Sequence, residues 1–173
     1  MKTATMEMKE GPKMFDTSID IPQKRRMELN MLMNQRLADA VDLQLQLKQA
    51  HWNVKGPHFI GLHKLFDKVN EDVQEYVDLI AERIVQLGGI AEGTARIAAK
   101  RSRLEEYPLS IASGVDHVEA VAKALAAFGH EARSTIAEAD ELEDVDTADL
   151  FTEVSRGIDK WLWMVEAHVH ATK

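Results

Sequence analysis

The chain has 173 residues, the size of one compact domain, of which 45% are hydrophobic and 29% are charged. Its 29 acidic residues outnumber its 21 Lys and Arg, and the net charge of -8 argues against a protein built mainly to coat nucleic acid. The absence of cysteine excludes disulfides, thiolate zinc sites and cysteine nucleophiles. Any metal must therefore be bound by His, Asp, Glu or backbone oxygen, a donor set that favours iron, manganese, magnesium or calcium.

The N-terminal segment contains no apolar run long enough for the core of a signal peptide, and acidic residues are scattered through it. No stretch of the chain approaches 18 uncharged apolar residues, so we expect no membrane-spanning helix and no membrane partner. These features predict a cytoplasmic protein.

Apolar residues recur at steps of three or four along four stretches, which predicts four helices. Between these stretches lie the few Gly and Pro residues, at positions that end helices. No stretch shows the alternating pattern of a strand. Asp146 and Thr147 are suited to cap the start of the last helix. The four apolar stripes cover residues 29–52, 62–87, 115–128 and 150–169.

The connections between the helices predict the topology of the bundle. Gly56 and Pro57 form a short turn, so the first two helices should be antiparallel neighbours. The link from Gly88 to about Gly114 is long, and we expect it to carry a short helix around residues 95–99. A four-helix bundle with one long crossover between its second and third helices is the ferritin-like topology. The predicted fold is therefore an all-α, ferritin-like four-helix bundle over residues 21–173, preceded by a flexible tail, residues 1–20.

Four potential metal ligands share one face of the second helix. At 100° per residue, the side chains fall at about 0, 40, 60 and 100° around the helix axis. Asp67 and Asp78 are nevertheless about 16 Å apart along the helix axis, too far for one ion to bridge within one chain. The four residues are His63, Asp67, Asp78 and Glu82.

Two copies of this helix could close that gap. The sequence midpoint between His63 and Glu82 is also the midpoint between Asp67 and Asp78. Two copies could pack antiparallel about a two-fold axis at that midpoint. His63 and Asp67 of one chain would then face Glu82 and Asp78 of the other chain. His51, at the end of the first helix, could add another imidazole to each cluster.

A solvated helix face is the alternative interpretation, because charged residues often occur at such spacings. His51 beside Trp52 could equally be a capped or packed histidine. An intrachain di-iron site is disfavoured, since ferritin-like proteins hold such metals with Glu-x-x-His pairs and no histidine here has a glutamate three residues before it.

The stretch KQAHWNVKGPHFIGLHKLFD, followed by DLIAERIVQLGG, resembles the DNA-binding proteins from starved cells, the Dps branch of the ferritin superfamily. The resemblance extends from about Gln23 to the end of the chain. It includes YPL in the crossover and the segments DTAD and DKWLW near the end.

This resemblance implies a shell of twelve identical subunits with iron-oxidising sites at the two-fold interfaces. It makes His51, His63 and Asp67 ligands from one subunit, and Asp78 and Glu82 ligands from its partner. It implies ferroxidase activity on Fe(II), chiefly with hydrogen peroxide, storage of ferric iron, and protection from oxidative damage. It also suggests that Trp52 intercepts oxidising equivalents.

Acidic residues cluster between the third and fourth helices. The simpler interpretation is a solvated loop and a negatively charged helix start, which the helix dipole favours. The resemblance implies instead a pore that attracts Fe(II), with Glu141, Asp146 and Asp149 as the candidate residues.

DNA binding is expected to be weak or absent, although the resemblance leaves association with the nucleoid open. Residues 1–20 carry three lysines against four acids, so the tail lacks the basic charge that binds phosphates. Two other functions are compatible with the sequence. One is an architectural protein that condenses DNA and binds iron incidentally; the other is a plain helical oligomerisation module.

Overall fold

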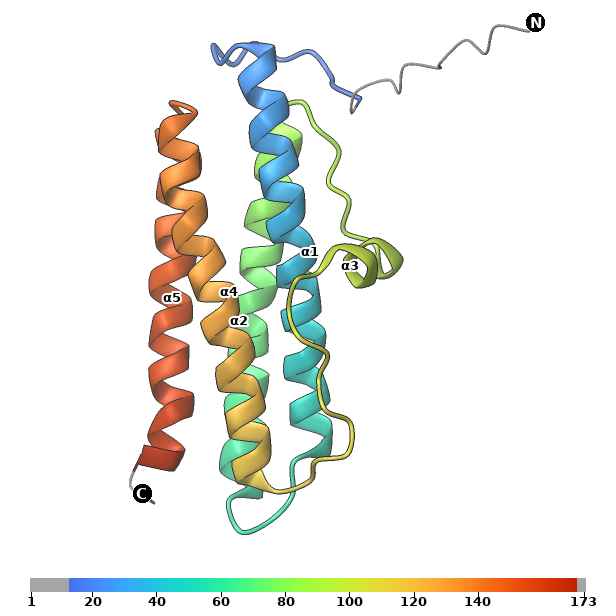
Figure 1. Ribbon diagram of the computed structural model, residues 1–173, viewed down its shortest axis with the longest axis vertical. Coiled ribbons are helices and arrows are strands. Elements are labelled where there is room, and N and C mark those ends of the chain that lie inside the picture. Colours follow the sequence, from blue (N-terminus) through green and yellow to red (C-terminus); the bar gives the residue numbers. More distant parts are fainter. Residues whose placement is uncertain (1–12, 171–173) are drawn as a thin grey trace, which may run out of the picture.

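A computed structural model describes residues 13–170 and contains five helices in that range. They are α1 (Gln23–Asn53), α2 (Phe59–Gln86), α3 (Ala95–Arg101), α4 (Gly114–Glu141) and α5 (Val145–His170). Four long helices lie side by side, and the crossover with α3 runs along the outside of α1 from one end of the bundle to the other (Figure 1). The predicted all-α, ferritin-like four-helix bundle with a short helix in its crossover is confirmed.

The bundle is built from two antiparallel hairpins, α1 with α2 and α4 with α5. Their facing stripes form one core in which the largest fully buried side chains are aromatic or aliphatic, among them Phe66, Phe128 and Phe151. Burying such side chains contributes roughly 1.5–3 kcal/mol each. Not every residue of the predicted stripes is internal. Leu45 and Trp52 on α1 are 54% and 64% exposed, and Val115 on α4 is 52% exposed.

The crossover is fixed to α1 by polar side chains that point away from the core. Asn34 binds the backbone of Ile90 and Glu92 at 3.0 and 2.8 Å, and Gln46 donates to the carbonyl of Glu105 at 3.0 Å. Asp39 accepts from the backbone amide of Arg103 at 2.8 Å and is fully buried. Helix α1 therefore buries residues on several sides, with core on one side and crossover backbone on another.

Helix α2 ends in a Schellman motif that requires glycine. Gly88 has a φ of 81°, and the amides of Gly88 and Gly89 donate to the carbonyls of Val85 and Ile84 at 2.9 Å each. A side chain at position 88 would also collide with the backbone carbonyl of Phe15. Phe15 itself donates its amide to the carbonyl of Gly88 at 2.7 Å.

The N-terminal tail predicted for residues 1–20 is described only from residue 13, so its first twelve residues lie outside the described part of the chain. Residues 13–20 have no helix or strand, and the amide of Phe15 connects them to the end of α2. Among the described residues, no helix is long and apolar enough to cross a membrane.

Candidate metal centre

His51 and His63 lie against each other where α1 ends and α2 begins. Their rings stack with centroids 3.7 Å apart and an interplanar angle of 21°. The Nδ1 atom of His51 is 2.7 Å from the carbonyl oxygen of His63, and Nδ1 of His63 is 2.8 Å from the carbonyl oxygen of His51. The short turn between the two helices makes this reciprocal contact possible, because it places the last turn of α1 beside the first turns of α2.

These two hydrogen bonds determine which ring nitrogen carries the proton. A carbonyl oxygen can only accept, so Nδ1 of each histidine must donate. In the neutral imidazole the Nε2 atom then has a free lone pair. Metal-ligating histidines are commonly oriented in this way, with the other ring nitrogen bonded to a carbonyl or carboxylate. The arrangement therefore leaves two imidazoles with a nitrogen able to bind a metal ion.

Asp67 adds a carboxylate one helical turn after His63. Its Oδ1 atom lies 3.8 Å from Nδ1 of His51 and 2.6 Å from Nζ of Lys48. The hydrogen bond from Lys48 lowers the pKa of Asp67, and the charge of Lys48 acts in the same direction. Asp67 is therefore anionic at neutral pH, and Lys48 occupies a position close to where a metal cation would bind.

Asp78 and Glu82 lie farther along α2, and both are exposed. No group of three or more His, Asp or Glu side chains within residues 13–170 of one chain is arranged to hold a metal ion. One chain thus presents two separate half-sets, with His51, His63 and Asp67 in one and the two distal carboxylates in the other. We predict that one half-set of each chain combines with the other half-set of a second chain across a two-fold axis.

Large apolar side chains are exposed around the half-sets. Ile60 and Val85 are 59% and 58% exposed, and both fall within the same arc of α2 as the four predicted ligands. On the neighbouring helix α1, three apolar residues whose spacings are multiples of seven are more than half exposed: Met31, Leu45 and Trp52. A face that combines exposed apolar side chains with self-complementary polar ones is typical of an interface between copies of one chain.

The three residues predicted for the pore, Glu141, Asp146 and Asp149, are all exposed near the turn between α4 and α5. The residue that caps α5 is Asp144, not Asp146 and Thr147 as the sequence suggested, because α5 begins at Val145. Asp144 accepts from the amide of Thr147 at 3.3 Å and from Arg83 of α2 at 2.8 and 3.0 Å. Sequence reasoning missed this buried ion pair, which fixes the acidic turn against the end of α2.

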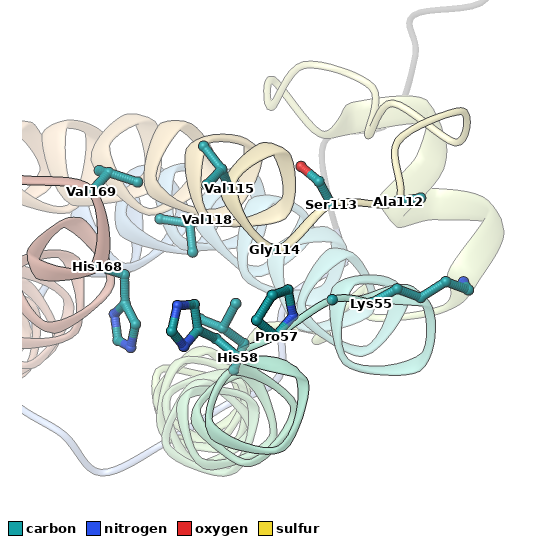
Figure 2. A pocket seen from close by; sticks show the side chains of 12 residues that line it. Lys55, Pro57, His58, Ala112, Ser113, Gly114, Val115, Val118, His168 and Val169 are labelled. Carbon is teal, nitrogen blue, oxygen red and sulfur yellow. The ribbon is translucent and has the colours of Figure 1, made fainter. Parts of the chain in front are cut away.

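A cavity of about 470 Å³ lies at the same end of the bundle as the two histidines, but none of the predicted ligands lines it. It is lined by the turn between α1 and α2, the start of α4 and the end of α5, and the side chains of His58 and His168 project into it (Figure 2). His168 donates Nδ1–H to the carbonyl of Met164 at 3.0 Å. The sequence shows no companion pattern for these two histidines, which only the fold brings to one cavity.

Comparison with known proteins identifies the family. A family model for the ferritin-like domain matches residues 30–173. The DNA protection during starvation protein of Agrobacterium fabrum is 40% identical over 157 residues, which is 91% of this chain and 97% of that protein.

Two solved structures agree with this assignment. DpsA14 from Streptomyces coelicolor is 32% identical with a TM-score of 0.85, and the match covers 92% of this chain and 93% of that one. Dps from Mycobacterium smegmatis, in its tetragonal form, is 30% identical with a TM-score of 0.84, over 90% of this chain and 94% of that one. With its bundle, its crossover and these relatives, the chain belongs to the Dps family of ferritin-like proteins.

Proposed function

We propose that this mini-ferritin oxidises Fe(II), chiefly with hydrogen peroxide, and stores the ferric product. The observation that carries the proposal is the half-site in which His51 and His63 keep Nε2 free while the carboxylate of Asp67 lies 3.8 Å from Nδ1 of His51. Imidazoles suit Fe(II), while carboxylates are hard anions that suit the Fe(III) product. Each reaction would consume two Fe(II), one hydrogen peroxide and two protons, and would give two Fe(III) and two water molecules.

The complete site would form between two chains, with Asp78 and Glu82 supplied by the partner. The exposed apolar residues around the half-sets support such a contact, because their burial would stabilise the pair. A closed shell of twelve subunits would carry a formal charge of roughly -96, a field that draws Fe(II) inward. Glu141, Asp146 and Asp149 are the proposed residues of the pore through which the ion passes.

Removing both imidazoles should abolish most of the ferroxidation. We expect His51→Ala/His63→Ala to oxidise Fe(II) with peroxide about 100-fold more slowly than the wild type, because the remaining carboxylates bind Fe(II) weakly. The rate is measured by the absorbance of ferric species after mixing with peroxide. His130→Ala/His170→Ala, which removes two exposed histidines elsewhere, is the matched control and should keep the wild-type rate. Equal rates in the wild type and the His51/His63 variant would contradict the site.

We propose that binding to DNA is weak, although relatives carry DNA protection in their name. The basic residues near the start of α1 are engaged within the chain. Arg25 pairs with Glu143 at 2.6 Å, and Arg26 donates to the carbonyl of Leu87 at 2.9 Å. In the crossover, Arg103 lies 3.6 Å from Glu131. These contacts reduce the basic charge that these three arginines can offer to phosphates.

In a gel-shift titration, plasmid DNA should therefore keep its mobility with this protein at about 150 mM salt, and any shift at low salt should vanish steeply as salt is added. A basic Dps-type protein under the same conditions is the positive control. A clear shift at physiological salt would favour the alternative function, an architectural protein that condenses DNA.

A further inference from the structure

Tyr107 and His117 form a buried hydrogen-bonded pair that the proposed iron site does not use. The hydroxyl of Tyr107 lies 2.6 Å from Nδ1 of His117, and the two rings are 6.0 Å apart at their centroids. Tyr107 is 7% exposed and His117 is 1% exposed. The pair joins the crossover to the first turn of α4.

The environment of the pair keeps both partners neutral. Burial lowers the pKa of His117, and the positive charge of Lys55 acts in the same direction, while Asp116 and the carbonyl of Asn53 oppose it. The imidazole is therefore neutral at pH 7. Burial also raises the pKa of Tyr107 far above its usual range, so the phenol keeps its proton. The phenol can then donate to the lone pair on Nδ1, an arrangement that leaves the imidazole proton on the buried Nε2 atom.

The pair lies at the same end of the bundle as the proposed iron ligands. Asn53 is the last residue of α1, two positions after His51, and its backbone acts on the pKa of His117. The backbone of Lys55 is bonded to the carbonyl of Ala112 at 3.0 Å, which ties the turn after α1 to the segment before α4. The turn between α1 and α2 and the start of α4 meet at this end (Figure 1).

We propose that Tyr107 is a redox-active residue that removes one-electron oxidants formed when Fe(II) meets hydrogen peroxide, with His117 as the acceptor of its proton. Tyr107 gives one electron to a hydroxyl radical, which becomes hydroxide. The O–H bond of the phenol breaks, its proton moves to Nδ1 of His117, and a neutral tyrosyl radical and an imidazolium remain. A further Fe(II) then reduces the radical, the proton returns from His117, and Fe(III) is released. This inference rests on the proposed function, because iron and peroxide supply the oxidant.

The second tyrosine of the chain offers a matched comparison. Tyr76 is also buried, at 8% exposure, and its hydroxyl lies against Gly157. The charges that influence it are those of Asp72 and Glu153, and burial together with these acids raises its pKa. Among the described residues, no histidine is hydrogen-bonded to Tyr76. A radical on Tyr76 would therefore lack a hydrogen-bonded imidazole to take its proton.

Electron paramagnetic resonance after rapid freezing tests the proposal. The wild type is mixed with Fe(II) and excess peroxide, and is also prepared with ring-deuterated tyrosine, which narrows a tyrosyl signal. We expect a tyrosyl signal that disappears in Tyr107→Phe and keeps at least half of its intensity in Tyr76→Phe. A signal that persists in Tyr107→Phe, a tryptophan signal in its place, or no protein radical at all would overturn the proposal.

A second measurement separates this proposal from the ferroxidase activity. In iron-free protein, a flash-generated ruthenium(III) polypyridyl oxidant should produce the same Tyr107 radical, and His117→Leu should remove it. If the wild type does not oxidise iron but the flash produces the radical, the proposed function fails and the redox pair stands. If iron is oxidised normally but neither experiment yields a radical on Tyr107, only the redox role of the pair fails. Circular dichroism and assembly mass establish that each variant is folded.

Discussion

Co-expression of two inactive variants should restore about a quarter of the wild-type rate of iron oxidation, if each site is shared between two chains. One variant, His51→Ala/His63→Ala, lacks the imidazole half of the site. The other, Asp78→Ala/Glu82→Ala, lacks the carboxylate half. Alone, each variant has two defective sites at every two-fold interface. In a mixed pair, one site lacks both the imidazoles and the carboxylates, and the other site is complete. Random pairing makes half of the interfaces mixed, and one of the two sites in each is intact.

The matched control combines His51→Ala with His63→Ala as separate single variants. Both lie in the same half of the site, so mixed pairs gain no intact site and the rate should stay at the level of the two variants alone. Mass spectrometry of the assembly verifies that mixed pairs form. Mixed assemblies without recovered activity would exclude a shared site and would favour iron oxidation elsewhere in the chain.

The geometry explains why this experiment is decisive. Within one chain the stacked pair of histidines and Asp67 lie at one end of α2, and Asp78 and Glu82 lie several turns away on the same face. A helix is rigid at this length, so no local rearrangement can bring the two half-sets together. Within residues 13–170 of one chain the two half-sets cannot meet, so the proposed cluster requires a second copy, and the common midpoint of the two residue pairs would make the helix self-complementary.

The helices and their order can be predicted from the sequence because each long helix faces a common core. Periodic apolar residues and the positions of Gly and Pro are enough to indicate four helices, the turn at Gly56 and the short helix in the crossover, which the structure has at α3. The apolar pattern is a poorer guide to burial. Trp52 and Leu45 continue the stripe of α1 yet are exposed, because a sequence pattern does not distinguish an apolar residue of the core from an apolar residue of the surface.

The polar interior of the bundle could not be predicted. Arg36 and Asp39 are almost completely buried on α1, and they bind Glu131 and Arg103, which lie 95 and 64 residues away in the sequence. Periodicity reports only which residues are apolar, so it treats such charges as solvated. The short turn predicts that His51 and His63 lie near each other, but the reciprocal bonds to backbone carbonyls, which free both Nε2 atoms, follow only from the structure.

The same limit applies to the histidines away from the candidate metal centre. The sequence shows no companion for His117, yet this histidine is the partner of Tyr107, ten residues earlier. No periodic pattern links a residue of an irregular crossover to one in a helix. A buried imidazole can be assigned a chemical role only after its neighbours are known, because the role depends on which nitrogen is free.

Arg36→Met should strongly destabilise the protein. Arg36 is 3% exposed and forms ion pairs with Asp39, at 3.5 Å, and with Glu131 of α4. Burial raises the pKa of Asp39; burial would also raise that of Glu131, but the Arg36 guanidinium holds it below its usual value. Methionine preserves much of the volume but leaves a fully buried carboxylate without its cation. Breaking a buried pair in this way costs about 3–5 kcal/mol of the free energy of unfolding.

For a chain of this length the loss corresponds to a fall in Tm of about 10 °C, measured by circular dichroism. Arg133→Met is the matched control, because Arg133 pairs with Asp159 at 2.7 Å but both side chains are about half exposed, and such a pair contributes less than about 1 kcal/mol.

The dependence on pH distinguishes lost charge from lost packing. In Arg36→Met the pKa of Asp39 is raised still further above its unfolded value, so stability is lost as pH rises through the folded pKa. The difference in free energy of unfolding between the variant and the wild type should therefore shrink as the pH is lowered. A deficit that does not change with pH would mean that packing, and not the unpaired carboxylate, causes the loss.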